Sequence, residues 1–367
     1  MSLFRLGDYT DIKTGKLDVN AENPAGKYPF FTCSKNHTYI DEYAFEGENV
    51  LVAGNGDLNV KYYNGRFNAY QRTYVIQTKN TLDTKYLYYF LENHLEKLRG
   101  QAIGGVIKYI KIGNLTEAEI PLPPLEQQQK IAAILDAADE LRQKDKALVA
   151  KYDELTQALF LDMFGNPVKN PMGWNMKYLG SLSRRIVVGH VGPTSSGYAE
   201  LGIPFLRTQN VRPNFINYKD LAHITVEFHN KLKKSQIFAN DVLISRVGVN
   251  RGMAAVVPDN LNEANCANVV IVGNTELLNS YYLSFFLNMS FGRKPEYGYS
   301  VGSAQGVVNT SIVKRWPIFN TPIILQNQFA ERVKAIEEQK SIAKASALKS
   351  EELFNSLLQK AFNGELV

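Results

Sequence analysis

Two long helical segments of this chain, residues 123–165 and 321–364, superimpose without a gap when the sequence is shifted by 198 positions. The shift sets Pro124 on Pro322 and Gln128 on Gln326. It also pairs apolar residues along both segments: Ile131 with Phe329, Leu135 with Val333, Leu155 with Leu353, Leu159 with Leu357, and Phe164 with Phe362. One shift that holds over the whole length of two helices indicates an internal duplication, so we expect the chain to fold as two related halves.

The first helical segment carries apolar residues in steps of three and four, which is the pattern of a coiled coil, and the second carries an apolar stripe that is more polar in the middle. A segment of about 40 residues extends roughly 60 Å as a helix, which is too long for a small domain to bury. We therefore expect the two helices to pair in antiparallel orientation, with the globular domains at opposite ends. The residues predicted to pair them are Ile131, Ile134, Leu141, Leu148, Leu155 and Leu159 in the first helix, and Phe329, Val333, Ile336, Leu353 and Leu357 in the second.

The segments that precede the two helices repeat more loosely. Short apolar and aromatic runs alternate with Gly and Asn in both, which is typical of short strands joined by turns. One helix is predicted in each, at Thr84–Leu98 and at Ser280–Asn288. The fold class is therefore mixed α/β with four parts: a first globular domain at 1–122, a central long helix at 123–165, a second globular domain at 166–320 and a C-terminal long helix at 321–367.

Length and composition indicate a globular protein with two sizeable cores, since 45% of the 367 residues are hydrophobic. No stretch approaches the roughly 20 uncharged apolar residues of a membrane span, and the first residues lack a signal-peptide pattern. Cys33 and Cys266 are too few for a disulfide framework and are expected to be unpaired thiols. These features predict a cytoplasmic location and no membrane partner.

The net charge of +5 is unevenly distributed. Residues 1–124 carry 14 basic and 14 acidic side chains, whereas residues 165–322 carry 16 basic and 8 acidic ones. The second globular segment therefore has the charge profile of a protein that binds a polyanion, and the first does not.

Motifs for catalysis are missing from the sequence. A DNA-modifying enzyme needs an Asn/Asp-Pro-Pro-aromatic motif, and the nearest strings, at 166–168 and 170–172, lack the second proline and the aromatic residue. Gly54-Asn55-Gly56 lacks the strand–loop–helix context of a cofactor loop. The five histidines are dispersed and show no metal-ligand spacing. The chain is therefore predicted to be non-catalytic, with no catalytic, cofactor-binding or metal-binding residues.

Both globular domains contain turn-rich segments that mix Arg, Asn and Gln with aromatic residues. Arg can bind guanine through two hydrogen bonds, and Asn or Gln can bind adenine in the same way, while Lys suits phosphates. The alternative is that these segments are ordinary solvated loops. The residues predicted to contact DNA are Asn55, Asn59, Lys61, Arg66, Gln71, Arg72 and Lys108 in the first domain, and Arg207, Gln209, Asn210, Arg212, Arg246, Asn250 and Arg251 in the second.

The sequence around the helices resembles a known family. Pro-Pro-Leu-Glu-Gln-Gln leads into the first helix at 123–128, and Phe-Gly-Asn-Pro follows it at 164–167. The counterparts are residues 322–326 and 362–364, where the second copy has Thr321 in place of the first proline. In these motifs the chain resembles the DNA-specificity (S) subunit of bacterial Type I restriction–modification systems, and the resemblance extends over the whole chain.

This resemblance implies two target-recognition domains that each read one half of a bipartite DNA site. It implies that the paired helices act as a ruler and as a docking platform for two methyltransferase subunits, with restriction subunits joining in the full complex. S-adenosylmethionine, Mg and ATP are then expected only in the partner subunits. Two other classes stay open: a structural coiled-coil scaffold and a single-chain DNA-modifying enzyme with degenerate motifs.

Overall fold

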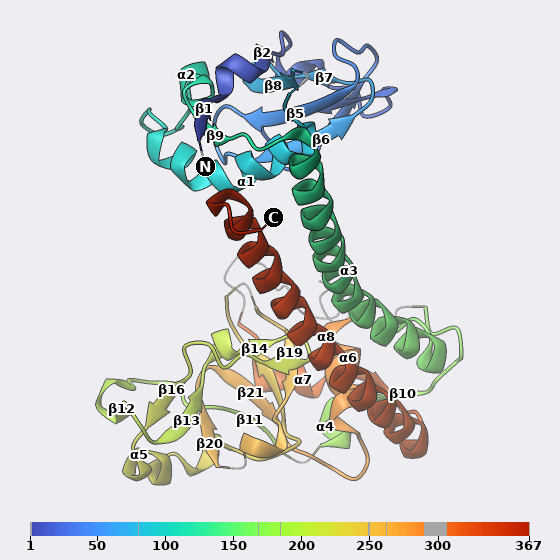
Figure 1. Cartoon of the computed structure of the whole chain (residues 1–367). Coiled ribbons are helices and arrows are strands. Elements are labelled where there is room, and N and C mark those ends of the chain that lie inside the picture. The colour runs from blue at the N-terminus through green and yellow to red at the C-terminus, as the bar shows by residue number, and fades with distance from the viewer. Residues whose placement is uncertain are drawn as a thin grey trace. The chain divides into compact units, whose positions relative to one another are not determined.

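The computed structural model describes residues 2–79, 81–167, 169–183, 185–248, 250–261, 263–289 and 307–366. The chain divides into two compact units, residues 1–148 with 343–367 and residues 149–342. Two long helices, α3 (Leu125–Phe164) and α8 (Ile323–Asn363), contribute a part to each unit (Figure 1). No helix in the described part of the chain combines the length and the apolar character needed to cross a bilayer.

An antiparallel sheet of four strands, in the order β2-β8-β5-β6, forms the centre of the first globular domain. Helix α1 (Thr84–Gln101) packs against β5 and β6, and a second sheet has the order β4-β3-β7. The other elements of this domain are β1 (Leu3–Arg5), η1 (Leu6–Tyr9), β2 (Thr10–Thr14), η2 (Val19–Ala21), β3 (Tyr28–Phe31), β4 (Thr38–Ile40), β5 (Glu48–Ala53), β6 (Val60–Asn64), β7 (Asn68–Ala69), β8 (Thr73–Thr78), α2 (Ile112–Thr116) and β9 (Glu119–Pro121).

The second globular domain repeats this topology. Its four-stranded sheet has the order β11-β21-β18-β19, and helix α6 (Ser280–Asn288) packs against β19 and β18. Strand β13 pairs antiparallel with β16 and parallel with β20, as β3 does with β4 and β7. The elements are β10 (Met176–Tyr178), α4 (Leu179–Leu182), β11 (Ile186–Val188), η3 (Ser195–Gly197), β12 (Tyr198–Ala199), β13 (Ile203–Leu206), η4 (Thr208–Asn210), β14 (Val211–Arg212), β15 (Phe215–Ile216), β16 (Ala222–Ile224), α5 (Val226–Lys231), η5 (Lys233–Ser235), β17 (Gln236–Ile237), β18 (Val242–Ser245), β19 (Ala254–Val256), η6 (Asp259–Leu261), β20 (Ala264–Cys266), β21 (Val269–Val272), α7 (Thr310–Lys314) and β22 (Pro317–Phe319).

The constant shift of 198 positions extends beyond the long helices. Helices α2 and α7, strands β9 and β22, and helices α3 and α8 all begin 198 residues apart. A Cβ atom at Gly7 would lie 2.9 Å from Thr116 Cβ, and one at Gly180 would lie 3.1 Å from Lys314 Cβ, so the same close approach recurs in both copies. The internal duplication predicted from the sequence is confirmed.

Both long helices are built into the hydrophobic cores of the globular domains. In the first unit Ile131 and Leu135, near the start of α3, share a buried cluster with Phe354 and Leu358, near the end of α8. In the second unit Phe160 and Phe164, at the end of α3, share one with Phe329 and Val333, near the start of α8. The start of one helix meets the end of the other in each unit, so the predicted antiparallel pairing and the mixed α/β fold are confirmed. The predicted helices at Thr84–Leu98 and Ser280–Asn288 correspond to α1 and α6.

The predicted set of helix-pairing residues is only partly correct. Ile131, Phe329 and Val333 are buried, and Leu159, Ile336 and Leu357 are partly buried. The prediction was wrong for five leucine and isoleucine residues, whose side chains are 38–50% exposed: Ile134, Leu141, Leu148, Leu155 and Leu353.

The physical reason for this error is that the middle of the helix pair is polar. In the first unit Arg142 and Lys146 both bind the Glu351 carboxylate, at 3.1 and 2.6 Å, and the Arg142 guanidinium lies 4.0 Å from the centre of the Phe354 ring. In the second unit Lys340 of α8 forms an ion pair with Asp153 of α3. Charged residues therefore occupy contact positions between the helices that we expected to be apolar. The row of apolar residues predicted from the spacing lies on the surface instead.

Candidate nucleic-acid interface

Three segments of the first domain that are distant in sequence meet at the end of strand β5. The Gly54 N–H donates to the Arg72 carbonyl at 2.8 Å, and the Gly56 N–H donates to the Lys108 carbonyl at 2.9 Å. These bonds bring the predicted DNA-contacting residues Asn55, Arg72 and Lys108 to one surface. Arg72 and Lys108 are exposed and Asn55 is partly buried.

A cavity of about 660 Å³ opens beside this junction. Its walls carry two tyrosines and two cations, and no carboxylate is present among the residues that line it. Such a lining suits a planar, anionic ligand, because aromatic faces stack on nucleobases and cations attract phosphate. The lining residues are Thr14, Gly54, Gln71, Arg72, Tyr74, Tyr109, Ile110, Lys111 and Ile112.

Three other predicted residues of the first domain are held by neighbours in the protein. The Asn59 side chain donates to the Cys33 carbonyl at 2.8 Å and accepts a hydrogen bond from Lys61. Burial lowers the pKa of the Lys61 ammonium. Arg66 pairs with Glu46 at 3.2 Å and lies 4.9 Å from the centre of the Tyr43 ring. None of the three lines the cavity at β5.

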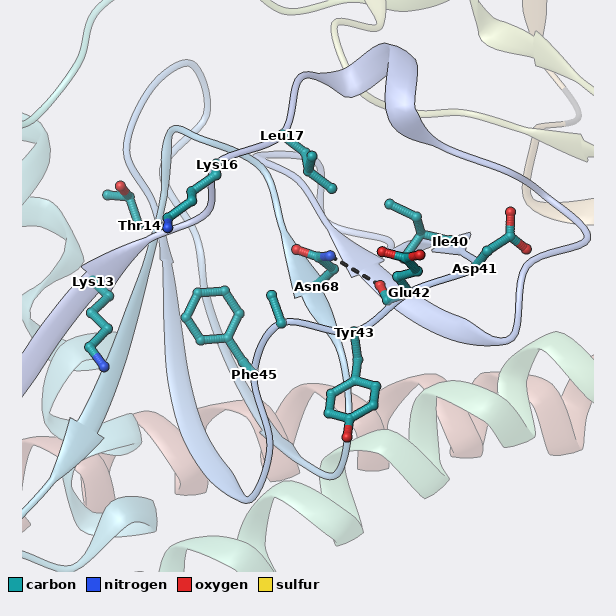
Figure 2. Close-up of a pocket in the computed structure, with 11 residues that line it drawn as sticks. Lys13, Thr14, Lys16, Leu17, Ile40, Asp41, Glu42, Tyr43, Phe45 and Asn68 are labelled. Atoms are coloured by element: carbon teal, nitrogen blue, oxygen red, sulfur yellow. Dashed lines mark hydrogen bonds between the residues drawn. The ribbon is translucent and has the colours of Figure 1, made fainter.

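A second cavity in the same domain, of about 710 Å³, was not suggested by the sequence. Figure 2 shows apolar side chains such as Phe45 and Leu17 beside the charged residues of its lining. The Asn68 amide holds one wall by donating to the Glu42 carbonyl at 3.0 Å. Lysines and carboxylates balance each other around this cavity, so its charge does not favour nucleic acid. The labelled lining residues are Lys13, Thr14, Lys16, Leu17, Ile40, Asp41, Glu42, Tyr43, Phe45 and Asn68.

In the second domain the structure brings together two predicted segments that are 38 residues apart. Arg212, at the end of β14, donates through Nη1 to the Asn250 side-chain oxygen at 2.8 Å. Asn250 is buried and Arg212 is partly buried. One edge of the guanidinium is therefore held by the protein, which restricts the side chain before any ligand arrives.

The remaining predicted residues of the second domain differ in their availability. Asn210 is fully buried and organises its own loop, accepting from the Arg207 N–H at 2.9 Å and donating to the Asn217 carbonyl at 2.9 Å. Arg246 donates to the Val308 carbonyl at 3.1 Å. Gln209 is exposed, and Arg207 and Arg251 are partly buried. A side-chain amide in a polar loop can thus form its hydrogen bonds within that loop, and the residue type alone does not indicate whether it does.

No cluster of three or more His, Cys, Asp or Glu side chains that could hold a metal ion occurs among the residues that the structure describes. Cys266 is buried, and burial raises the pKa of its thiol. Cys33 is partly buried.

Comparison with known proteins shows which proteins this chain is similar to. Residues 1–150 match the type I restriction modification DNA specificity domain. The type I restriction enzyme EcoDI specificity subunit of Escherichia coli is 39% identical over 154 residues, which cover 42% of this chain. The MjaIX specificity subunit of Methanocaldococcus jannaschii is 26% identical over 318 residues, which cover 78% of this chain and 70% of that protein.

Among solved structures, the S subunit of a type I restriction–modification system from M. genitalium superimposes with a TM-score of 0.63 at 17% identity, covering 98% of this chain and 96% of that one. At this identity the likeness shows the fold. The segment matched in the EcoDI subunit spans about a third, 34%, of that protein's length. The predicted resemblance to type I restriction–modification specificity subunits is confirmed, and residues 1–150 carry the DNA specificity domain of that family.

Proposed function

We propose that this chain is the DNA-reading subunit of a type I restriction–modification complex. Residues 1–122 read one half of a bipartite site, and residues 166–320 read the other half. The chain itself performs no chemistry, and S-adenosylmethionine, Mg and ATP are bound by its partner subunits. The methyltransferase subunits dock on the long helices.

The observation that carries this proposal is that one scaffold is used twice with different loops. The two four-stranded sheets have equivalent strand orders, but only six residues, 32–37, join β3 to β4 in the first domain. In the second domain β13 and β16 are joined by residues 207–221, which contain the β14–β15 hairpin and Arg212. Two domains with equivalent sheets and different polar loops suit the recognition of two different DNA sequences.

The exposed apolar residues of α3 support docking of a protein partner. Ile134, Leu141, Leu148 and Leu155 follow one another at intervals of seven, so they lie along one face of the helix. Each is at least 38% exposed. Such a row in contact with water favours association with another protein.

The experiment that tests the proposal co-expresses the chain with its methyltransferase subunits and maps methylated adenines in the host DNA by sequencing. We expect one motif with two specified halves and an unspecified spacer between them. An uninterrupted motif would contradict bipartite reading. Partner assembly without any sequence preference would favour the scaffold, and methylation by the purified chain alone would favour a single-chain enzyme.

Docking is tested by the double substitution Leu141→Glu with Leu148→Glu, which should abolish co-purification of the methyltransferase subunits. The matched control is Ala150→Glu. Ala150 is also exposed but lies nine residues beyond Leu141, about two and a half turns, on the opposite face of α3. Equal retention of the partner by both variants would place the docking surface elsewhere.

A further inference from the structure

Residues 103–109 of the first domain form a short hairpin with an apolar, exposed tip. The Ile103 N–H donates to the Tyr109 carbonyl at 3.0 Å, and the Tyr109 N–H donates back at 2.8 Å. At the tip Val106 is fully exposed and Ile107 is 62% exposed. Two adjacent β-branched side chains in water add nothing to the core of the domain, so their position favours contact with a partner.

The conformation of this tip is set by a glycine. Gly104 has a φ angle of +115°, and a Cβ atom there would lie 2.6 Å from the Ile107 carbonyl oxygen. The Gly56 N–H bond to the Lys108 carbonyl ties the other side of the hairpin to the turn after β5. The backbone thus presents Val106 and Ile107 in a preformed arrangement, which lowers the entropy cost of insertion into a ligand.

The cavity of about 660 Å³ adjoins the hairpin, because Tyr109 both closes the hairpin and lines the cavity. Gly54, the first residue after β5, forms another part of its lining. A Cβ atom at Gly54 would lie 2.4 Å from the Arg72 carbonyl oxygen, so no larger residue fits there. The backbone of the domain therefore fixes the wall of the cavity, as it fixes the conformation of the hairpin tip beside it.

The second domain differs from the first in sequence at the positions that match Gly54, Val106 and Ile107. Arg246 is the first residue after β18, the strand that matches β5, and its carbonyl accepts a hydrogen bond from the Val308 N–H just as Gly54 accepts one from Ile110. The Arg246 side chain also binds the Val308 carbonyl. At the constant shift of 198 positions, Val106 and Ile107 correspond in sequence to Ala304 and Gln305. At these matching positions, the sequence of the second domain therefore has neither the apolar pair nor the glycine that adjoins the cavity in the first.

We propose that the first domain displaces a nucleobase of its half-site from the stack, with Val106 and Ile107 entering the duplex and the cavity beside Tyr109 holding the displaced base. Apolar wedges are a known means of unstacking a base step. Tyr74 and Tyr109 supply aromatic side chains for the base, and Arg72 and Lys111 supply charges for the flanking phosphates. This inference rests on the proposed function, since it names how one of the two readers engages DNA.

The test uses the complex of the chain with its methyltransferase subunits and duplexes that carry the mapped site. 2-Aminopurine replaces each purine in turn, because its fluorescence rises when it leaves the stack. We expect a rise on binding at a position in the half-site of residues 1–122 that is distinct from the methylated adenine. The double variant Val106→Ser with Ile107→Ser should lose this rise and bind about tenfold or more weakly, from the loss of one or two buried apolar side chains.

The matched control is Val19→Ser, which alters a 41% exposed valine outside the hairpin and should retain both the rise and the affinity. All these side chains are on the surface, so equal melting temperatures will show that the variants fold. If the wild-type complex binds the site but 2-aminopurine fluorescence rises at no position other than the methylated adenine, the inference is overturned and the proposed function stands. The inference is also overturned if the double variant binds DNA normally. It is likewise overturned if the double variant loses its methyltransferase subunits and not its affinity for DNA. A wild-type complex that shows no site preference would overturn both.

Discussion

The side-chain oxygen of Gln326 accepts a hydrogen bond from the Asn279 backbone N–H at 2.9 Å, at the point where α6 begins. Gln128 accepts the same bond from the Asp83 N–H at 2.9 Å, at the start of α1. Each glutamine also donates to a backbone carbonyl just before its own long helix, Thr321 at 2.9 Å and Pro123 at 2.7 Å. The duplicated glutamine therefore ties each long helix to the cap of the helix in its globular domain.

Gln128→Leu and Gln326→Leu should each lower the free energy of unfolding by about 1–3 kcal/mol, because a backbone N–H loses its partner at a buried side chain. Both glutamines are at most 2% exposed. Gln129→Leu, at an exposed neighbouring position, serves as the control and should change stability little. Thermal or denaturant unfolding measures the difference, and an unchanged midpoint in both variants would contradict a structural role for this bond.

Substitutions in one globular domain should relax selection in one half-site only. Gln71→Ala or Arg72→Ala should affect the half read by residues 1–122, and Arg212→Ala the other half, each lost base contact costing about 1–3 kcal/mol. Asn250→Ala should partly reproduce Arg212→Ala, because Asn250 holds the guanidinium. Methylation maps of the variants decide this. A change in both half-sites from one substitution would show that the domains do not read independently.

The polar contact between the long helices should make stability depend on pH. The hydrogen bond from Lys146, helped by Arg142, lowers the pKa of Glu351 below its ordinary value of 4.5. A carboxylate with a lowered pKa in the folded state stabilises the fold above the unfolded pKa, and this contribution is lost as pH falls through the folded value. Glu351→Gln should therefore lower the melting temperature at neutral pH, with the difference shrinking below about pH 4.5.

The control for this pH series is Glu352→Gln, which alters the exposed neighbour of Glu351. It should track the wild type at every pH. A constant difference between Glu351→Gln and the wild type across the series would show that the carboxylate charge is not what matters.

Under the proposed function, the length of the long helices should set the distance between the two half-sites. Inserting four residues, roughly one turn or about 6 Å, in both α3 and α8 should lengthen the spacer in the methylated motif. The insertions belong in the polar middle of the helices, between the clusters around Ile131 and Phe160. An insertion variant that still methylates DNA with the original spacer would refute the ruler model.

Much of the architecture follows from sequence alone because it depends on local or periodic signals. A constant shift of 198 positions reveals two copies, apolar residues at helical spacing locate α1, and the repeat locates α6 as its counterpart. These features need no knowledge of what packs against them.

Which face of a long helix is buried was decided only by the tertiary structure. Leu141 and Leu148 continue the apolar spacing, but the partner helix meets Arg142 and Lys146 through Glu351 instead. Periodicity reports that a helix has an apolar stripe and does not report whether the stripe faces its own chain or another molecule.

The same limit applies to the polar loops. Asn210 and Gln209 are adjacent and were equally plausible as base readers, yet one is fully buried in its own loop and the other is exposed. Residue type determines which hydrogen bonds a side chain is able to make. Whether a side chain forms those bonds within the protein or is available to bind DNA depends on contacts between distant parts of the chain, which only the tertiary structure decides.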